Sequence, residues 1–316
     1  MDAIERYRTV VLIPCHNEEA TIANVVAGFR EALPSADVYV FDNNSTDNTA
    51  DAAERSGAKV RRVLLQGKGN VLRRMFADVD ADFYVLVDGD NTYDAASAPK
   101  LVEMLRKESL DMVVGIRLPV GTSAYRPGHA LGNRLLTGVL SSLFGRRCKD
   151  VLSGYRAFSR RFVKSFPVFS IGFEIETELT VHALQMSMNI AEVPTTYKER
   201  QKGSTSKLRT FSDGARILFT ILQLFSIERP MVFYGGIALV LALGSVVLAV
   251  PIFQTYLETG LVPRFPTAIL STGMILLSAL FFFVGLILAN VTRGRQELKA
   301  MFYLQQTRGI EPKTSE

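Results

Sequence analysis

The first third of the chain alternates between short apolar runs and amphipathic segments. The apolar runs, each of which predicts a buried strand, lie at 9–14, 37–42, 59–65, 83–88 and 111–116. Segments with helical periodicity lie between them, at 18–33, 47–56, 68–77 and 99–107. Strands that alternate with helices of this length predict an α/β fold with a parallel sheet covered on both faces. Such sheets bind ligands beyond the carboxyl ends of their strands, so we expect the chemistry there.

Two long stretches without charge lie in the last third of the chain. Residues 230–257 and 265–292 contain no Asp, Glu, Lys or Arg, and a helix needs about 20 residues to cross a bilayer. The short polar connection QTYLETGLVPRF separates the two stretches, so the pattern predicts a transmembrane helical hairpin. Two buried core helices are the alternative, but core helices of this length usually carry a polar stripe.

Two amphipathic segments precede the hairpin. Residues 129–144 place their leucines on one side, and residues 208–225 have a similar pattern directly before the first uncharged stretch. Either segment could lie in the membrane interface or pack against the sheet. We favour the interface for the second segment because of its position.

The charge pattern favours a cytoplasmic location for the chain outside the hairpin. The chain carries 36 Lys and Arg against 31 Asp and Glu, a net charge of +5. Basic residues flank both ends of the hairpin, which predicts that both termini face the cytoplasm. The apolar run at 9–14 is too short for a signal peptide. We interpret the net charge as attraction to an anionic membrane surface and expect no nucleic-acid partner.

One apolar run ends directly in carboxylates, in the sequence YVLVDGDNTYD at 84–94. Charges at a buried strand end are costly to desolvate, and like charges repel. A bound cation would resolve this conflict. Asp88 and Asp90, with Asn91 beside them, supply the hard oxygen ligands that Mg²⁺ or Mn²⁺ prefers. The alternative is a surface turn with solvated Asp side chains.

The glycine motifs argue against two classes of nucleotide-binding protein. After the first strand the chain reads PCHNEEATI rather than the G-x-G-x-x-G of a dinucleotide-binding fold, and it contains no G-x-x-x-x-G-K-[ST]. Gly67-Lys68-Gly69 at a strand-to-helix turn could offer backbone N–H groups and one cation to a phosphate. Asp42, at the end of the second strand, could accept from a ribose or a base, or cap a helix.

Several motifs together resemble a known family. PCHNEEATI, FDNNSTD, GKGN and DGDNTYD, in this order and spacing, resemble the inverting GT-A glycosyltransferases of family 2. VVGIR, LSGYRAF, GFEIETEL and YKERQKGSTSKL narrow the resemblance to the polyprenyl-phosphate glycosyltransferases, the group of dolichol-phosphate mannose synthase. The resemblance covers about residues 8–210. It implies a GT-A-type, Rossmann-like, mostly parallel sheet, followed here by interfacial helices and a two-helix transmembrane hairpin.

The resemblance also implies roles for individual residues. A nucleotide-diphosphate sugar would be bound by Pro14, Asn17, Glu18, Asp42, Lys68 and Asp88. The phosphate of a polyprenyl acceptor, undecaprenyl or dolichyl phosphate, would be bound by Arg117, Arg126, Arg134, Ser153, Arg156, Arg200 and Lys207. Asp90, Arg117 and Arg200 would act in catalysis, and Asp88, Asp90 and Asn91 would hold Mg²⁺ or Mn²⁺. Glu174 or Glu176 lies where the acidic residue of an inverting enzyme is expected.

Two departures from the family pattern leave the donor open. The common D-D-G-S after the second strand reads DNNS at 42–45, and the residues after DGD are NTY at 91–93. UDP-glucose, another UDP-hexose and GDP-mannose all stay candidates.

The resemblance implies inverting, metal-dependent transfer of a hexose to a membrane polyprenyl phosphate. A phosphate monoester is already a nucleophile at neutral pH, so the site needs cations more than a strong base. The organisation we expect is a cytoplasmic catalytic domain at 1–207, a juxtamembrane amphipathic helix at 208–229, the hairpin at 230–292 and a cytoplasmic tail at 293–316.

Other functions stay open at this point. A processive polysaccharide synthase usually carries a Q-x-x-R-W motif, and this chain has no Trp. A glycosyltransferase could act on another lipid acceptor. The protein could also be a non-enzymatic membrane scaffold or a partner of a lipid-linked-sugar flippase. In that case the carboxylates and arginines of the motifs would have no chemical role. Small residues in the first hydrophobic stretch, Gly235, Gly236, Gly244 and Ser245, would allow close helix packing and assembly into a homo-oligomer.

Overall fold

The structure is a computed structural model of the 316-residue chain. It describes residues 7–119, 137–138, 149–168, 170, 172, 174–198 and 210–306, and the side chains of the last range from 217 onward. The chain divides into two compact units. The first, which we call the α/β unit, comprises Met1–Ile221 together with Lys299–Glu316, and the second, the hairpin unit, comprises Leu222–Leu298.

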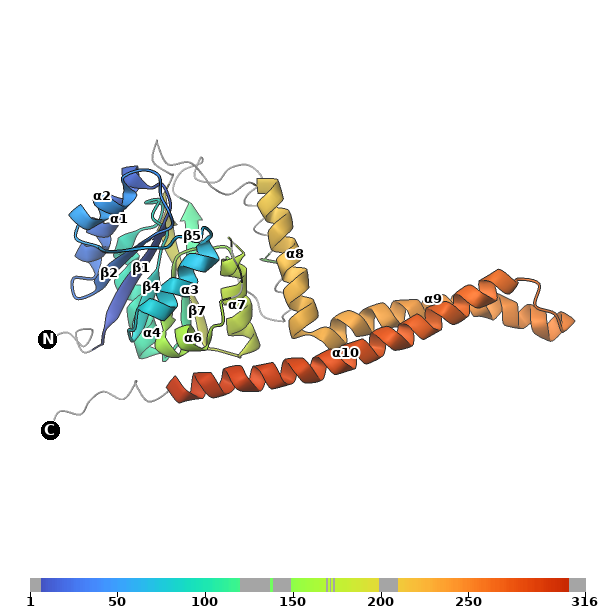
Figure 1. The fold of residues 1–316 in the computed structure, drawn as a ribbon. Helices are drawn as coiled ribbons and strands as arrows, with labels where there is room; N and C mark the ends of the chain where they lie inside the picture. Colours follow the sequence, from blue (N-terminus) through green and yellow to red (C-terminus); the bar gives the residue numbers. More distant parts are fainter. Residues whose placement is uncertain are drawn as a thin grey trace. The chain divides into compact units, whose positions relative to one another are not determined.

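The α/β unit is built on one mixed sheet (Figure 1). Its described strands are β1 (Thr9–Cys15), β2 (Asp37–Asp42), β3 (Lys59–Arg62), β4 (Phe83–Leu86), β5 (Met112–Pro119), β6 (Arg156–Ser159) and β7 (Ile190–Tyr197). They lie in the order β3-β2-β1-β4-β6-β5-β7. β6 runs antiparallel to both of its neighbours, and every other pairing is parallel. The carboxyl ends of β1, β2, β3, β4, β5 and β7 therefore meet at one edge of the sheet.

Helices cover both faces of this sheet. One face carries α1 (Glu19–Ala32), α2 (Thr49–Arg55) and α4 (Ala98–Lys107), and the other carries α3 (Lys68–Asp78), α6 (Arg160–Ser165) and α7 (Ile175–Gln185). The central strand β1 shows why its sequence is continuously apolar. Val11 and Ile13 belong to one core cluster, while Val10 and Leu12 belong to the cluster on the opposite face. A strand buried on both faces has no solvent side for polar residues.

The α/β fold predicted from the sequence is confirmed, with its first five strands and four helices in the expected order. Two strands were predicted too long: β4 ends at Leu86, before the DGD turn, and β3 ends at Arg62. After β3, the Asn43 side chain donates to the carbonyls of Val63 and Leu65 and holds the chain in a loop. β6, β7, α6 and α7 were not predicted. The predicted segment 129–144 lies outside the described residues except for 137 and 138.

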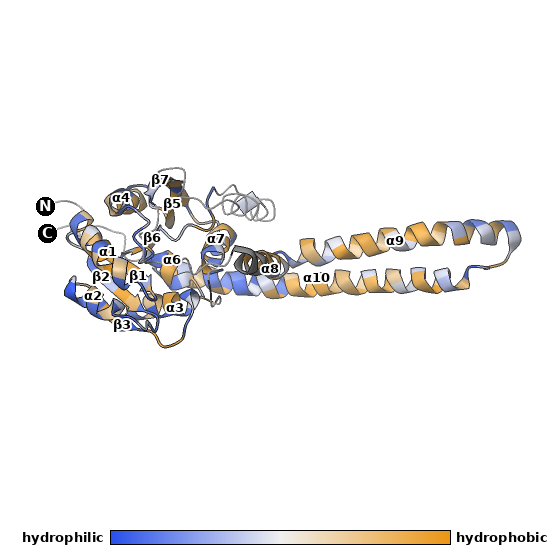
Figure 2. Ribbon diagram, turned by 90° about the horizontal axis from the view of Figure 1, so that it is seen from above, coloured by the Kyte–Doolittle hydropathy of each residue, from blue (hydrophilic) through white to orange (hydrophobic). Residues whose placement is uncertain are grey.

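The hairpin unit contains two long apolar helices, α9 (Pro230–Thr259) and the greater part of α10 (Phe265–Gln305). Both are long and apolar enough to cross a membrane by length and composition, and hydrophobic residues cover most of their length (Figure 2). Serines join the two helices. Ser245 Oγ lies 3.1 Å from Ser271 Oγ, and Ser278 Oγ donates to the Ala238 carbonyl at 2.7 Å. In an apolar solvent, such hydroxyls need partners within the protein.

The predicted juxtamembrane helix is present as α8 (Thr210–Glu228). Ile217, Ile221 and Phe225 recur every four residues on one buried face. Phe219 and Leu222 are exposed on the other side of the helix. A helix that is apolar on its exposed face as well as its buried one suits a membrane interface, and the interfacial position of this segment stays a prediction.

The end of α10 belongs to the α/β unit rather than to a separate tail. The Tyr303 hydroxyl donates to the buried carboxylate of Asp111, with oxygen–oxygen distances of 3.2 and 3.1 Å. The Lys299 ammonium donates to the Gln185 side chain at 2.8 Å. These contacts lie at the amino end of β5 and the carboxyl end of α7.

A buried histidine makes the stability of the α/β unit depend on pH. His182 on α7 is 3% exposed and packs against the rings of Phe162 and Phe166. Burial, with a smaller effect from the Lys299 charge, lowers the pKa of the His182 imidazole to about 3. Below the unfolded pKa of about 6.5, the unfolded chain therefore binds a proton that the folded chain does not. The free energy of unfolding thus decreases as the pH is lowered below this value.

We expect the free energy of unfolding to fall by about 2 kcal/mol from this residue alone between about pH 7.5 and about pH 5. The His182→Gln variant should lose correspondingly less over the same range. Denaturant unfolding of the full chain in detergent, followed by circular dichroism, measures both values. An identical pH dependence in the two proteins would contradict the assignment.

Candidate active site

A cavity of about 300 Å³ lies at the edge where the parallel strands end. The sheet topology explains its position, since the loops that leave these strands converge there. Its lining includes Pro14, Cys15, His16, Glu18, Asn43, Gln66, Gly67, Lys68, Val71, Asp88, Gly89, Asp90, Tyr93, Arg117, Leu152, Glu176, Tyr197 and Ile217. The lining therefore holds four carboxylates and two basic side chains next to apolar ones.

The DGD turn after β4 places both of its carboxylates on the cavity. Asp90 is 4% exposed and accepts from the Thr92 backbone and hydroxyl, at 3.1 and 2.5 Å. A Cβ at Gly89 would lie 2.5 Å from the Cys15 sulfur, so only glycine fits between the turn and β1. The Thr21 hydroxyl donates to the Gly89 carbonyl at 2.7 Å. The turn is thus fixed from two sides.

Lys68 stands between two carboxylates inside the cavity. Its ammonium lies 2.5 Å from Asp88 Oδ1 and 2.5 Å from Glu176 Oε1, and its side chain is 8% exposed. Burial alone would lower the pKa of Lys68, but the two carboxylates raise it above its usual value. Burial also raises the pKa of Glu176, against the opposing effect of Lys68. The other oxygen of Glu176 is buried without a hydrogen-bond partner among the described residues.

Of the two glutamates that the sequence left open, the structure places Glu176 in the cavity. Glu174 instead accepts from the Gly172 backbone at 3.0 Å and does not line the cavity. Glu176 lies in the first turn of α7, and Glu174 precedes the helix.

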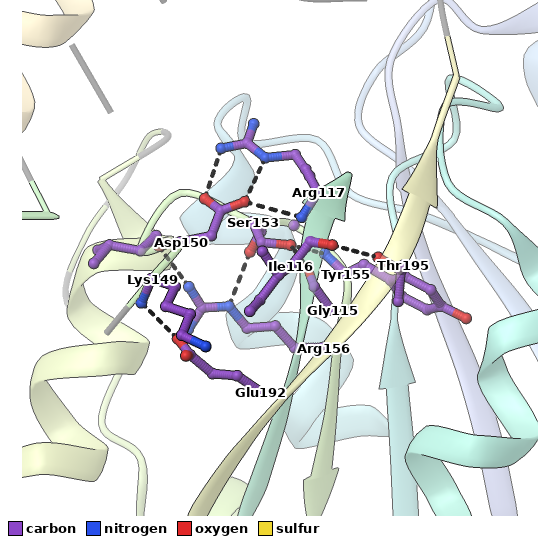
Figure 3. A network of polar contacts seen from close by, with 12 residues as sticks. Gly115, Ile116, Arg117, Lys149, Asp150, Ser153, Tyr155, Arg156, Glu192 and Thr195 are labelled. Carbon is purple, nitrogen blue, oxygen red and sulfur yellow. Dashed lines mark hydrogen bonds and ion pairs between the residues drawn. The ribbon is translucent and has the colours of Figure 1, made fainter. Parts of the chain in front are cut away.

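Arg117 at the end of β5 also lines the cavity, held by a second buried carboxylate (Figure 3). Its Nε and Nη2 each lie 2.7 Å from one oxygen of Asp150, which is 4% exposed. Its guanidinium also lies over the ring of Tyr197, at 5.7 Å. A guanidinium bound through two parallel hydrogen bonds has a fixed plane, so Asp150 sets the direction in which Arg117 faces.

The segment 150–156 positions Asp150 and, through it, Arg117 (Figure 3). Arg156 is 0% exposed and donates to the carbonyls of Val151 and Ser153, at 2.6 and 2.9 Å, and to the Thr180 hydroxyl at 2.9 Å. Ser153 Oγ donates to the Gly115 carbonyl at 2.6 Å. Ser153 and Arg156, which we expected to bind the acceptor phosphate, therefore lie inside the fold and not on the cavity. They hold the loop through hydrogen bonds instead.

Gly154 in the same loop makes room for Asp88. A side chain at Gly154 would collide with the Asp88 carboxylate. Its backbone N–H donates to the Tyr93 hydroxyl at 2.9 Å, and burial raises the pKa of this phenol. The LSGYRAF motif thus shapes the site through packing and hydrogen bonds.

The remaining predicted residues divide into three groups. Pro14 and Glu18 line the cavity as expected. Asn17, Asp42 and Asn91 are not on its lining: Asn17 accepts from Thr46, Asp42 accepts from Ser45, and Asn91 faces a neighbouring cavity. Arg126, Arg134, Arg200 and Lys207 lie outside the described residues.

Comparison with known proteins identifies the kind of fold and the family. The α/β unit resembles the crystal structure of glucosyl-3-phosphoglycerate synthase from Mycobacterium tuberculosis in complex with Mn²⁺, UDP-glucose and phosphoglyceric acid. The TM-score is 0.56 at 25% identity, over 70% of this chain and 80% of that one. The mostly parallel sheet of this protein therefore has the fold of a GT-A glycosyltransferase.

Residues 10–166 match the family described as glycosyl transferase family 2. Glycosyltransferase AglJ of Haloferax volcanii is 34% identical over 233 residues, which cover 72% of this chain and 75% of that protein. The chain belongs to glycosyl transferase family 2.

Two further relatives carry more specific names. A dolichyl-phosphate hexose transferase of Haloferax volcanii is 28% identical over 69% of this chain and 94% of its own length. An undecaprenyl-phosphate mannosyltransferase of Micrococcus luteus is 26% identical over 63% of this chain and 86% of its own length.

The buried Lys68 allows a stability prediction. We expect Lys68→Met to lower the free energy of unfolding by about 3 kcal/mol or more, because it leaves two buried carboxylates without their cation. Adding Glu176→Gln should recover part of this loss, since it removes one of the two charges. Denaturant unfolding of the full chain in detergent measures the single and double variants. Losses that simply add in the double variant would contradict the coupling.

Asp150 should act through Arg117. We expect Asp150→Asn to lower kcat/KM for sugar transfer about 100-fold, because small misplacements of a binding group have effects of this size. The variant should have no further effect when Arg117 is already Ala. Lys149→Ala, at the exposed neighbouring position, is the control and should stay near wild type. Independent effects of Asp150→Asn and Arg117→Ala would rule out this role.

Proposed function

We propose that the protein transfers a hexose from a nucleotide-diphosphate sugar to a membrane polyprenyl phosphate, with inversion at the anomeric carbon. The observation that carries this proposal is the pairing of two kinds of group in one cavity. The DGD carboxylates suit a metal-bound donor diphosphate, and Lys68 and Arg117 bring positive charge to two anionic substrates. The names of the two lipid-phosphate transferases and the two apolar helices of this chain support a lipid acceptor.

The site fits a divalent cation that is shared with the substrate. Among the described residues, no three His, Cys, Asp or Glu side chains are close enough to hold a metal by themselves. Mg²⁺ is commonly bound by one or two carboxylates together with substrate phosphates, so Asp88 and Asp90 would suffice once the donor is present. The unpartnered Glu176 oxygen in the same cavity adds acceptor capacity nearby. When bound, the metal would stabilise the negative charge of the leaving diphosphate.

The chain's own residues have two tasks in this reaction. An oxygen of the acceptor phosphate forms a bond to the anomeric carbon, while the bond from that carbon to the donor diphosphate breaks and the nucleoside diphosphate leaves. No proton has to be removed from the nucleophile, since a phosphate monoester is already ionised. Lys68 and Arg117 reduce the repulsion between the two anions, and Asp150 keeps the Arg117 guanidinium in one plane. Fixed groups of this kind need little rearrangement during the reaction.

The two apolar helices suggest how the site reaches its acceptor. A polyprenyl chain leaves the bilayer only at a cost of about 0.8 kcal/mol per exposed CH₂. A hairpin that crosses the membrane twice keeps the segments on its two sides in the same compartment, and the basic residues at 293–299 and before 230 favour the cytoplasm. The α/β unit would then meet the acceptor phosphate at the cytoplasmic surface.

Transfer assays with purified protein in detergent test the proposal. The assay would combine a short-chain polyprenyl phosphate, Mg²⁺ or Mn²⁺ and a panel of radiolabelled UDP- and GDP-sugars. We expect label from one donor to enter the organic phase, with a loss of about 100-fold or more in Asp90→Ala. Asp51→Ala, an exposed carboxylate on α2, is the matched control and should keep full activity. Absence of transfer from every donor by folded protein would overturn the proposed acceptor.

A further inference from the structure

The segment between β3 and α3 exposes two adjacent leucines. Leu64 is 80% exposed and Leu65 is 70% exposed. Outside α8 and α10, Leu118 is the other large hydrophobic side chain that is exposed in the described part of the α/β unit. Single exposed apolar residues are ordinary on protein surfaces, but two largely exposed neighbours on one short loop are a candidate contact surface.

The loop that carries these leucines is held in place. Asn43, itself 7% exposed, donates from its side-chain amide to the carbonyls of Val63 and Leu65, at 3.1 and 2.7 Å. Its side-chain oxygen accepts from the Gly67 backbone at 2.8 Å. One buried side chain thus fixes the backbone on both sides of the pair. The exposure of Leu64 and Leu65 therefore follows from a loop backbone that Asn43 fixes by hydrogen bonds.

The sequence around the leucines is basic. Residues 59–74, KVRRVLLQGKGNVLRR, contain six Lys or Arg and no Asp or Glu. Five of the six are exposed, while Lys68 lies buried in the cavity. Arg62 is exposed directly before the buried Val63, and Arg61 is 45% exposed although it pairs with Asp78 at 3.4 Å. Apolar side chains flanked by basic ones match the surface of a membrane that contains anionic lipids, where acyl chains lie beneath negative headgroups.

The loop that carries Leu64 and Leu65 lies beside the cavity. Gln66, Gly67 and Lys68, which follow the leucines directly, line the cavity. A chain with two helices that can cross a membrane keeps its other parts close to lipid. A lipid surface is thus the partner that the charge and the tether both favour.

We propose that Leu64 and Leu65 insert into the membrane interface and hold the mouth of the cavity at the level of the lipid headgroups. This inference goes beyond the proposed reaction, because it depends on neither the sugar nor the acceptor. It assigns a membrane contact to a loop of the α/β unit, in addition to the hairpin.

The absence of Trp from the chain makes the test direct. In Leu65→Trp the introduced indole is the single Trp of the protein and reports its own surroundings. The variant would be reconstituted in vesicles of phosphatidylcholine and phosphatidylglycerol, with and without bromine on the acyl chains. We expect brominated lipid to reduce the emission about two-fold, since interfacial side chains reach roughly 5–10 Å into the headgroup and acyl boundary. The reduction should weaken in vesicles without phosphatidylglycerol.

The matched control is Lys107→Trp. Lys107 ends α4 and its side chain is 62% exposed. α4 leads into the amino end of β5, so this position lies at the opposite edge of the sheet from the cavity. We expect its emission to be insensitive to bromine. Equal quenching at the two positions would overturn the proposal. So would a blue-shifted emission of Leu65→Trp that bromine leaves unchanged, which would indicate a protein partner or a second copy of the chain.

A second variant asks whether the contact matters for the reaction. Leu64→Ser with Leu65→Ser should raise KM several-fold for an acceptor embedded in vesicles and leave KM for a short-chain acceptor in detergent unchanged. The quenching experiment needs no activity, so failure of the proposed function and failure of the membrane contact are distinguishable. An equal change in KM for both acceptors would mean that the substitutions disturb the site itself.

Discussion

The site depends on charges that the fold buries and then neutralises in pairs. Asp88 follows the apolar strand β4 and lines the cavity, and Lys68 contacts both Asp88 and Glu176. Arg117 lies near the carboxyl end of β5, and Asp150 binds it through two parallel hydrogen bonds. Each pair would be costly to leave incomplete, because an unpaired buried charge loses its hydration without compensation. These pairs therefore hold their members in place before any substrate arrives.

Residues behind the cavity lining hold these charged pairs in position. Arg156 is completely buried, yet it is the residue that holds the loop between Val151 and Ser153 in place. That loop carries Asp150 toward Arg117 and leaves the space at Gly154 that the Asp88 carboxylate fills. Within the motif LSGYRAF, Ser153, Gly154 and Arg156 thus support the site by position, while Leu152 lines the cavity. The site of this glycosyltransferase is organised from β4, β5 and a loop distant from both in sequence.

Sequence alone predicted much of this arrangement, for identifiable reasons. Strands buried on both faces leave unbroken apolar runs, so β1, β2 and β4 were visible, and the DGD turn stood out because carboxylates follow such a run. β6 was missed because it is four residues long and begins with a charged residue, Arg156, whose burial depends on partners far along the chain. The same limit explains why Arg156 was expected to bind phosphate. A motif shows that an arginine is important, but only the tertiary contacts show which way it faces.

The α/β unit is discontinuous in sequence, since it takes its last element from beyond the hairpin. The hydrogen bonds from Tyr303 to Asp111 join residues 192 positions apart. Contacts so distant in sequence form late, because the intervening chain must first be made and ordered. At synthesis rates of about 5–20 residues per second, Asp111 waits on the order of ten seconds or more for its partner. During biosynthesis, the two apolar stretches at 230–257 and 265–292 are therefore made before the last contact of the α/β unit can form, so this unit is completed only after the hairpin.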